Sequence, residues 1–169
     1  MTESTSYEEL REWIRGKHLT HGELAVIDGA TGSGKTKLVM RLAKDLGGVR
    51  VSLDCYVRAG TDGYFVDRLM SEFLADDIGR FRKLFPLVLV EGICVREALE
   101  RLGVSWAATI YVKQLATNGL WHFQLHLEDF ASGNALREDE VEPFRSDYDY
   151  HLRHRPHEAA DFIHVRVAD

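Results

Sequence analysis

A glycine-rich stretch between an apolar run and an amphipathic segment limits the possible folds of this chain more than any other feature. Gly29, Gly34, Lys35 and Thr36 match the pattern G-x-x-x-x-G-K-[ST]. Glycines at this spacing let backbone N–H groups turn toward phosphate oxygens, and a following helix adds the positive end of its dipole. The alternative is a glycine-rich turn that carries a Lys-Thr pair by chance. The strand pattern before it and the helix pattern after it favour a phosphate-binding loop.

Such a loop holds the polyphosphate of a nucleoside triphosphate. In this interpretation Lys35 reaches the β- and γ-phosphates, and the Thr36 hydroxyl binds Mg²⁺. The predicted nucleotide-binding residues are Gly29, Ala30, Thr31, Gly32, Ser33, Gly34, Lys35 and Thr36.

Strand-like and helix-like segments alternate along the rest of the chain. Apolar runs predict strands at residues 23–28, 49–54, 86–92, 106–112 and 160–167. Helical spacing and capping residues predict helices at 6–16, 35–48, 64–85, 94–103, 120–130 and 138–155. We expect the third helix to break near Gly79 and residues 131–135 to form a flexible link. The alternation predicts a mainly parallel sheet with helices on both faces, a three-layer α/β fold.

Size and composition narrow the function classes. The chain has 169 residues, which suits one compact domain. A net charge of −6 argues against a nucleic-acid partner held by electrostatics. Two cysteines, Cys55 and Cys94, are too few for a disulfide framework and fit a reducing compartment. The polar N-terminus does not resemble a signal peptide, and no apolar run approaches the roughly 20 residues of a membrane span. We therefore expect a cytoplasmic protein with no membrane partner.

Acidic residues follow two of the predicted strands. Ligands of parallel sheets bind at the carboxyl ends of the strands, so residues 29–36, Asp54 and Glu91 should meet on one rim. Asp54 could accept the proton of an attacking hydroxyl or contact the metal, although Asp is also common in helix caps and turns. Glu91 ends an apolar strand and would orient Mg²⁺ or one of its waters; the alternative is a surface acid at a strand end.

The order of these motifs resembles that of uridine kinase-like P-loop kinases. The chain carries AVIDGATGSGKT, VSLDCY, LVLVEG and RPHEAADFIHV in sequence, and the resemblance spans Leu24 to Val165. It implies a three-layer P-loop NTPase fold and a single kinase-like domain over residues 1–169. It also implies that ATP, with Mg²⁺, donates a phosphoryl group to a hydroxyl of a nucleoside or similar small metabolite.

The same resemblance implies roles for individual residues. Asp54 matches the catalytic base and Glu91 the Walker B acid of this family. Asp161 matches a residue near the nucleotide base, and Tyr56 would lie beside the acceptor. Further residues that could line the acceptor site are Arg58, Tyr64 and Arg68.

The segment after the fourth predicted strand departs from the family. Such kinases usually carry an arginine-rich lid there, whereas residues 113–138 hold one arginine, Arg137, besides Lys113. Arg137 is therefore the candidate catalytic cation of the lid. Three later arginines could take its place: Arg145, Arg153 and Arg155. The sequence identifies neither the acceptor nor the oligomeric state.

Histidines recur at regular spacing in two segments. His122 and His126 lie four residues apart, and three others follow every third residue: His151, His154 and His157. Since no set of cysteines or carboxylates completes a zinc site at suitable spacing, we interpret them as solvent-facing or substrate-facing side chains.

Two other functions are alternatives to a small-molecule kinase. A GTPase switch is disfavoured because the D-x-x-G at Asp76 lies in a helical stretch and no N-K-x-D signature occurs. A nucleotide-binding module with weak or lost transferase activity stays open, and the arginine-poor lid is its basis.

Overall fold

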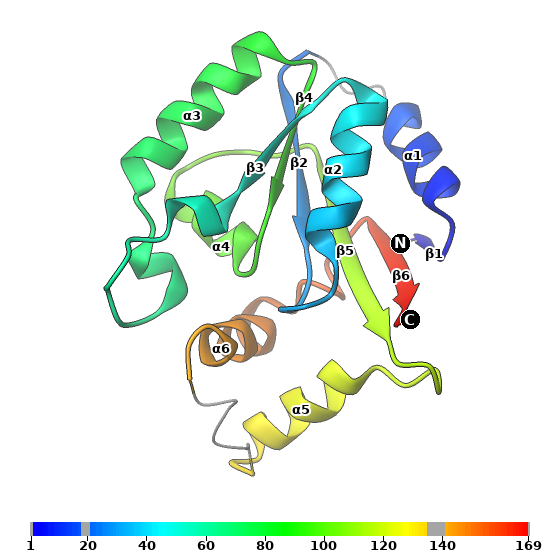
Figure 1. Ribbon diagram of the computed structural model, residues 1–169, viewed down its shortest axis with the longest axis vertical. Coiled ribbons are helices and arrows are strands. Elements are labelled where there is room, and N and C mark those ends of the chain that lie inside the picture. The colour runs from blue at the N-terminus through cyan, green and yellow to red at the C-terminus, as the bar shows by residue number, and fades with distance from the viewer. Residues whose placement is uncertain (1, 18–20, 135–140, 169) are drawn as a thin grey trace.

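A six-stranded sheet forms the centre of the molecule, as seen in a computed structural model that describes residues 2–17, 21–134 and 141–168. Its strands are β1 (Thr2–Ser4), β2 (Glu23–Asp28), β3 (Val49–Ser52), β4 (Leu87–Glu91), β5 (Ala108–Leu115) and β6 (Phe162–Val167). They lie in the order β1-β6-β5-β2-β4-β3, and every neighbouring pair is parallel. The predicted parallel sheet is confirmed (Figure 1).

Helices connect these strands. They are α1 (Tyr7–Gly16), α2 (Lys35–Leu46), α3 (Ser71–Leu84), α4 (Val95–Arg101), α5 (His122–Ala131) and α6 (Phe144–His154). The first begins at Ser6, whose hydroxyl accepts the N–H of Glu9, as its sequence predicts. The second ends at Gly47 in a left-handed conformation with φ of 65°. Short 3₁₀ turns cover Leu53–Tyr56 and Phe65–Arg68.

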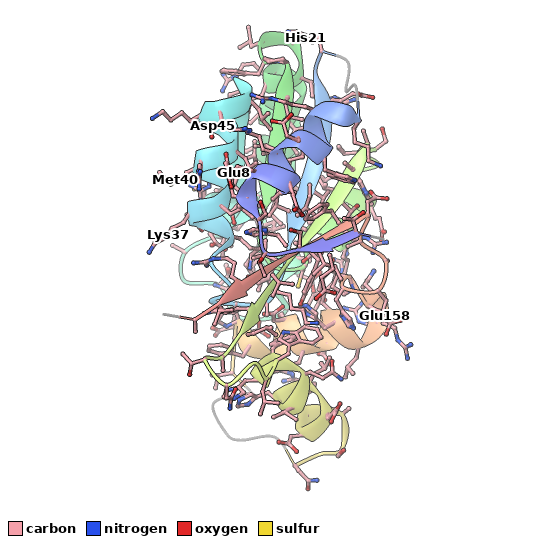
Figure 2. The ribbon with its side chains drawn as sticks, turned by 90° about the vertical axis from the view of Figure 1, so that its right-hand side faces the viewer. Glu8, His21, Lys37, Met40, Asp45 and Glu158 are labelled. Atoms are coloured by element: carbon pink, nitrogen blue, oxygen red, sulfur yellow. The ribbon has the colours of Figure 1, made fainter. Side chains whose placement is uncertain are left out.

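One face of the sheet is covered by α1 and α2. Buried side chains of the two helices pack on those of β2, β4 and β5. The helix residues include Leu10, Ile14, Val39 and Leu42, and the strand residues include Ile27, Leu89 and Ile110. Polar contacts also join the helices, since Tyr7 donates to Asp45 at 2.7 Å and Arg41 donates to Glu8 at 3.2 Å. Figure 2 shows Glu8 and Asp45 on this pair of helices.

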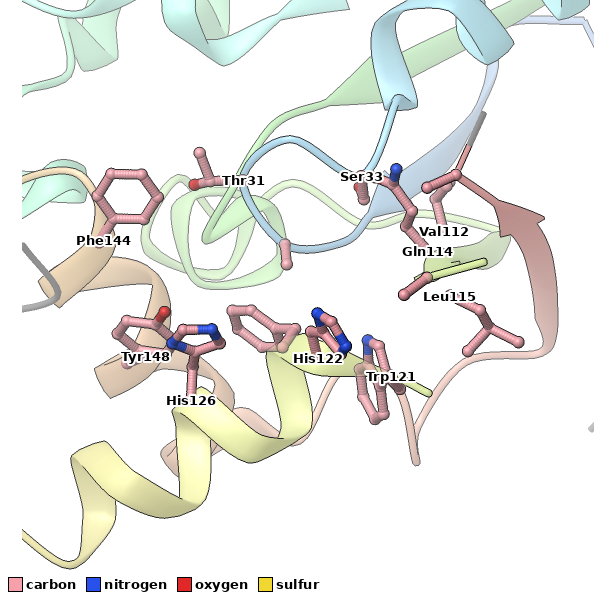
Figure 3. Close-up of a pocket in the computed structure, with 14 residues that line it drawn as sticks. Thr31, Ser33, Val112, Gln114, Leu115, Trp121, His122, His126, Phe144 and Tyr148 are labelled. Carbon is pink, nitrogen blue, oxygen red and sulfur yellow. The ribbon is translucent and has the colours of Figure 1, made fainter. Parts of the chain in front are cut away.

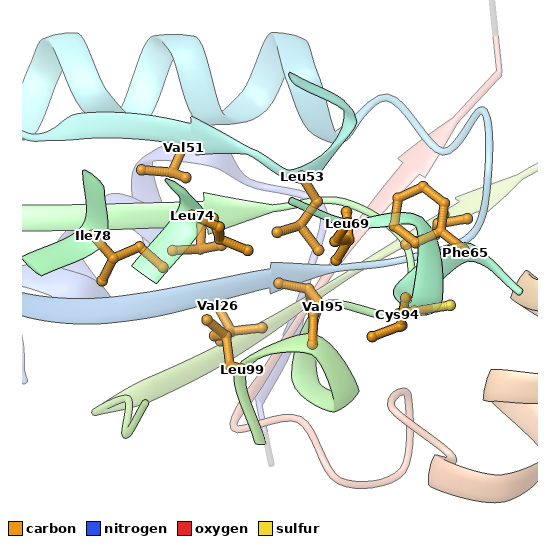
Figure 4. Close-up of a cluster of buried hydrophobic side chains, with 14 of the residues drawn as sticks. Val26, Val51, Leu53, Phe65, Leu69, Leu74, Ile78, Cys94, Val95 and Leu99 are labelled. Atoms are coloured by element: carbon orange, nitrogen blue, oxygen red, sulfur yellow. The ribbon is translucent and has the colours of Figure 1, made fainter. Parts of the chain in front are cut away.

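The opposite face is covered by α3 and α4. Their buried residues pack on β2, β3 and β4 in one cluster, shown in Figure 4, which includes Leu74, Ile78, Val95, Leu99, Val26 and Val51. Helices on both faces complete the predicted three layers.

The carboxyl edge of the sheet faces α5 and α6. The arrowhead of β5 points toward α5 in Figure 1. The two helices pack together through Phe123 and Tyr148, whose rings stack with centroids 5.2 Å apart. Residues 113–134, the described part of the segment expected to form a lid, therefore lie where the loop of residues 29–34 emerges. None of the helices in the described part of the chain combines the length and the hydrophobicity that a membrane span requires.

Three sequence predictions need correction. The strand β1 was missed because its side chains are largely exposed and give no apolar pattern. The predicted strand 49–54 ends at Ser52, and Asp54 lies in a 3₁₀ turn. The predicted helix 64–85 breaks just before Ser71, whereas Gly79 lies inside α3. Packing of the buried face of α3 on the sheet offsets the roughly 1 kcal/mol that an interior glycine costs a helix.

Candidate functional site

Residues 29–34 form a loop between β2 and α2 at the carboxyl edge of the sheet. Gly34 immediately precedes α2 and has a φ of 87°, a left-handed conformation that glycine adopts without strain. A Cβ atom at Gly34 would lie 1.4 Å from Nη1 of Arg166. Glycine is therefore required here both for the backbone conformation and for the close approach of the Arg166 guanidinium.

Lys35 is buried against the loop, with 7% of its surface exposed. Its Nζ donates to the backbone carbonyls of Gly29 and Ala30, each at 2.7 Å. Burial lowers the pKa of Lys35, while the carboxylates of Asp147 and Asp28 act in the opposite direction. The Lys35 ammonium thus holds the loop in its conformation by donating to two of the loop's own carbonyl groups.

Two carboxylates lie at the same edge, in different environments. Glu91 ends β4 and is 1% exposed; its Oε1 accepts hydrogen bonds from Nε of Arg50, at 2.9 Å, and from Nη2. Asp54 is exposed, and within the described part of the chain no donor bonds to it. Desolvation raises the pKa of Asp54, and the negative charge of Glu91 raises it further. Glu91 is therefore neutralised by an arginine, whereas Asp54 is free to accept a proton.

A hollow of about 900 Å³ joins the loop to both carboxylates, and we call it the loop hollow. It brings together much of the predicted site on one rim. Its lining includes Thr31, Gly32, Gly34, Lys35, Thr36, Asp54, Phe65, Arg68, Glu91, Gln114 and Arg166.

The oxygen donors of the loop hollow fit Mg²⁺. Thr36, Asp54 and Glu91 supply a hydroxyl and two carboxylates, and Mg²⁺ usually takes one or two carboxylates together with water and phosphate oxygens. Among the described residues, no group of three or more His, Cys, Asp or Glu side chains could hold a metal ion. A cation here would therefore complete its shell with hydroxyl, water or phosphate oxygens.

A buried carboxylate of α6 holds the first turn of the loop. Asp147 is fully buried, and its Oδ2 accepts the Thr31 N–H at 2.6 Å and the Thr31 hydroxyl at 2.9 Å. On its other side, Nδ1 of His151 lies 3.0 Å from Oδ1. The His151 Nε2 is 2.9 Å from the hydroxyl of buried Tyr111 on β5. These contacts connect the loop, α6 and β5 below the surface.

A second buried carboxylate holds the start of the loop. Oδ1 of Asp28 accepts the Gly29 N–H at 2.7 Å, and its Oδ2 accepts the hydroxyl of Tyr150 from α6. Burial raises the pKa of Asp28, opposed chiefly by the charge of His151. α6 thus contacts the loop region at two places.

An aromatic pocket of about 510 Å³ lies beside the loop, toward β5 and β6. Its lining includes Ala30, Thr31, Ser33, Gln114, Trp121, His122, Phe123, His126, Phe144 and Tyr148. Figure 3 shows His122 and Tyr148 across the pocket from Thr31 and Ser33. Aromatic walls with a few polar groups suit a flat ring system. The loop therefore has this pocket on one side and the loop hollow, with Asp54 and Arg68, on the other.

Asp161, which the resemblance places near the nucleotide base, lies away from both pockets, and its role there stays a prediction. Oδ2 of Asp161 accepts the N–H of Thr109 at 2.9 Å, and the residue lines neither the loop hollow nor the aromatic pocket. Asp161 precedes β6, whereas ligands of parallel sheets bind beyond the carboxyl ends of the strands.

The predicted acceptor residues are also largely elsewhere. The hydroxyl of Tyr56 donates to Asp77 at 2.8 Å, and that of Tyr64 donates to Glu97 at 2.7 Å. Arg58 is exposed, and none of the three lines the loop hollow. Arg68, from the same segment, does line it.

Of the arginines expected near a lid, the three that the structure describes, Arg145, Arg153 and Arg155, line neither pocket. Arg137 lies outside the described residues. Arg153 contacts Tyr64 and pairs with Glu97 at 3.0 Å. Arg155 pairs with Glu158 at 3.4 Å, and Arg145 is exposed.

Sequence reasoning missed Arg166 and Asp147. Arg166 follows the rule used for Asp54 and Glu91, because it lies near the carboxyl end of a predicted strand. It could have been found by applying that rule to the last strand. Asp147 gives no such signal: its contact with Thr31 spans 116 residues of sequence.

Comparisons with known proteins find neither a matching family model nor a matching curated protein. Among solved structures, one described as a possible uridine kinase from Bacillus stearothermophilus has a TM-score of 0.63 and 13% identity, covering 94% of this chain and 96% of that one. A shikimate kinase from Bacteroides thetaiotaomicron matches with a TM-score of 0.43 and 16% identity, covering 83% and 84% of the two chains. The hydrogenase maturation factor HypB from Archaeoglobus fulgidus matches with a TM-score of 0.45 and 21% identity, covering 94% and 86%. The parallel sheet, the loop between β2 and α2 and the first of these similarities agree: the chain has the P-loop NTPase fold.

Proposed function

We propose that this protein transfers a phosphoryl group from Mg²⁺-bound ATP to a hydroxyl of a small metabolite such as a nucleoside. The observation that carries the proposal is the loop hollow, where Lys35 and Thr36 lie on the same rim as Asp54 and Glu91. Phosphoryl transfer needs a phosphate cradle, a metal and a group that orients the nucleophile. Those three requirements match the residues of this hollow.

The loop side binds the nucleotide. Backbone N–H groups of residues 29–36 and the N-terminus of α2 face the phosphates, and Lys35 exchanges its carbonyl contacts for phosphate oxygens. Thr36 and Glu91 would hold Mg²⁺ directly or through water, and Asp54 would also contact it. The ion, when bound, neutralises charge that develops on the phosphates.

The acceptor side lies toward β3 and β4. There Asp54 takes the proton of the acceptor hydroxyl, a role favoured by its exposed carboxylate and its raised pKa. Phe65 and Arg68 line this end of the hollow. The base of the nucleotide occupies the aromatic pocket at the other end, beside Trp121 and Phe123.

A second candidate is a nucleotide-binding module with weak or lost transferase activity. Its basis is that, within the described residues, no arginine of the expected lid lines either pocket. Arg137 remains the predicted lid cation. Acceptor-dependent turnover separates the two candidates, because a binding module would hold ATP without it.

Calorimetric titration of Mg·ATP into the wild-type protein and Lys35→Ala tests the nucleotide site. We expect at least about tenfold weaker binding for Lys35→Ala, since a hydrogen bond to a charged group contributes about 1.5–3 kcal/mol. Lys44→Ala is the matched control, because Lys44 lies exposed on the same helix. Equal ATP affinity of folded Lys35→Ala and wild type would contradict the proposed site.

A further inference from the structure

Arg166 lies on the last strand, at the carboxyl edge of the sheet. Its backbone pairs with Gln114 of β5, and β6 lies between β5 and β1. β1 pairs with β6 only over Phe162–His164, so at Arg166 it is the pairing with β5 that fixes the direction from which the side chain leaves the sheet. A cation on this strand is therefore in place before any segment closes over the site.

The guanidinium of Arg166 lies directly against the phosphate loop. Its Nη1 donates to the carbonyl of Ser33 at 3.1 Å, and it fills the space that a side chain at Gly34 would need. Arg166 also lines the loop hollow together with Lys35 and Thr36.

The positive charge of Arg166 has no ionic partner among the side chains that the structure describes. Among residues 2–17, 21–134 and 141–168, no carboxylate forms an ion pair with Arg166, while Arg50 pairs with Glu91 and Arg153 with Glu97. A guanidinium has five N–H donors, and the Ser33 contact uses one of them. The planar arrangement of the others matches the oxygens of a phosphate group.

Besides Lys35, the loop hollow is lined by two other cations, Lys37 and Arg68, and both are placed less well for this role. Lys37 projects outward from the first turns of α2 in Figure 2. Nε of Arg68 is directed to the Thr61 hydroxyl, at 3.4 Å, on the side of the hollow that holds Asp54. Neither makes a contact with the loop like that of Arg166.

We propose that Arg166 binds the polyphosphate of the nucleotide held by the loop, and so supplies from a strand positive charge that adds to that of the arginine-poor lid. This inference rests on the proposed function. Because the guanidinium is positioned in advance, its contribution extends to nucleotide binding itself and is not confined to the transfer step.

Calorimetric titrations of Mg·ATP and of adenosine into Arg166→Gln and Arg166→Lys test the proposal. We expect the dissociation constant for ATP to rise at least about tenfold in Arg166→Gln, the scale of one lost hydrogen bond to a charged group, with adenosine binding unchanged. Arg166→Lys should show a smaller loss for ATP, since it keeps the charge and loses the planar fork. Arg15→Gln, an exposed arginine of α1, is the control and should bind ATP like wild type.

Several outcomes would overturn the proposal. One is a folded Arg166→Gln with wild-type affinity for ATP; another is an equal loss for adenosine and ATP, which would make Arg166 a structural tie between β6 and the loop. Should Arg166→Gln not fold, Arg166→Lys decides: a loss for ATP alone supports the proposal, and no loss overturns it. A wild type that binds no ATP would overturn the proposed function as well. ATP binding that Lys35→Ala loses and Arg166→Gln keeps would overturn the Arg166 inference alone.

Discussion

The two carboxylates at the ends of β3 and β4 occupy different environments, and the difference suits different tasks. Glu91 is buried and paired with Arg50, which fixes the direction of its carboxylate. Asp54 lies exposed in a 3₁₀ turn, with its pKa raised by desolvation and by Glu91. At the scale of single residues, one acid is therefore suited to orient a metal and the other to exchange a proton.

This assignment predicts the behaviour of Asp54→Asn. Loss of a general base reduces turnover by roughly 10²–10⁴-fold, while ATP affinity should stay close to that of wild type. The base must be ionised, so wild-type kcat/KM should fall as pH drops through the pKa of Asp54. Because that pKa is raised above its ordinary value of 3.8, the decline should begin at a higher pH than for an ordinary aspartate.

Steady-state rates and calorimetry across a pH series would check this prediction. Asp62→Asn is the control, since Asp62 is exposed and lines neither pocket. Full activity of Asp54→Asn would show that another group takes the proton.

At the scale of elements, α6 connects distant parts of the chain to the loop. Its residues Asp147 and Tyr150 contact Thr31 and Asp28, which flank the start of the loop. We expect residues 113–138 to act on the nucleotide as a lid. The helix after that segment, α6, contacts the loop from the interior of the molecule.

We predict that Asp147→Ala weakens both stability and ATP binding. It leaves the partly buried Thr31 N–H without its acceptor, which costs about 1–3 kcal/mol of unfolding free energy. Urea denaturation and calorimetric titration measure the two effects. Asp147→Asn should recover part of each, because its amide oxygen can still accept from Thr31.

Asp149→Ala makes the same change on the same helix at a half-buried position and serves as control. If Asp147→Ala and Asp149→Ala bound ATP equally well, α6 would have no part in positioning the loop.

The elements show which features the sequence could predict. Strands β2, β4 and β5 and helices α1 and α2 follow from local apolar spacing and caps, and the rim residues follow from the rule for parallel sheets. The contacts of Asp147 with Thr31 and of Arg166 with Ser33 join residues more than a hundred positions apart, and no local pattern encodes them. Asp161 precedes β6, and the motif match that implied its role near the base does not encode which end of the strand it occupies.

At the scale of the whole molecule, the loop divides the carboxyl edge into two compartments. The aromatic pocket lies toward β5 and β6, and the loop hollow extends toward Asp54 after β3. A nucleotide whose base occupies the first would direct its terminal phosphate into the second. In the proposed function, the donor phosphates and the acceptor hydroxyl then meet in the loop hollow, while the base of the donor lies in the aromatic pocket.

The most direct test of this account is ADP release from Mg·ATP in the presence of single acceptors from a panel of nucleosides, sugars, sugar acids and vitamin alcohols. The account predicts that one acceptor raises the rate well above the background of ATP alone, and that Asp54→Asn removes this increase. A flat panel, with ATP binding established by calorimetry, would contradict phosphoryl transfer to these acceptors and favour a nucleotide-binding module.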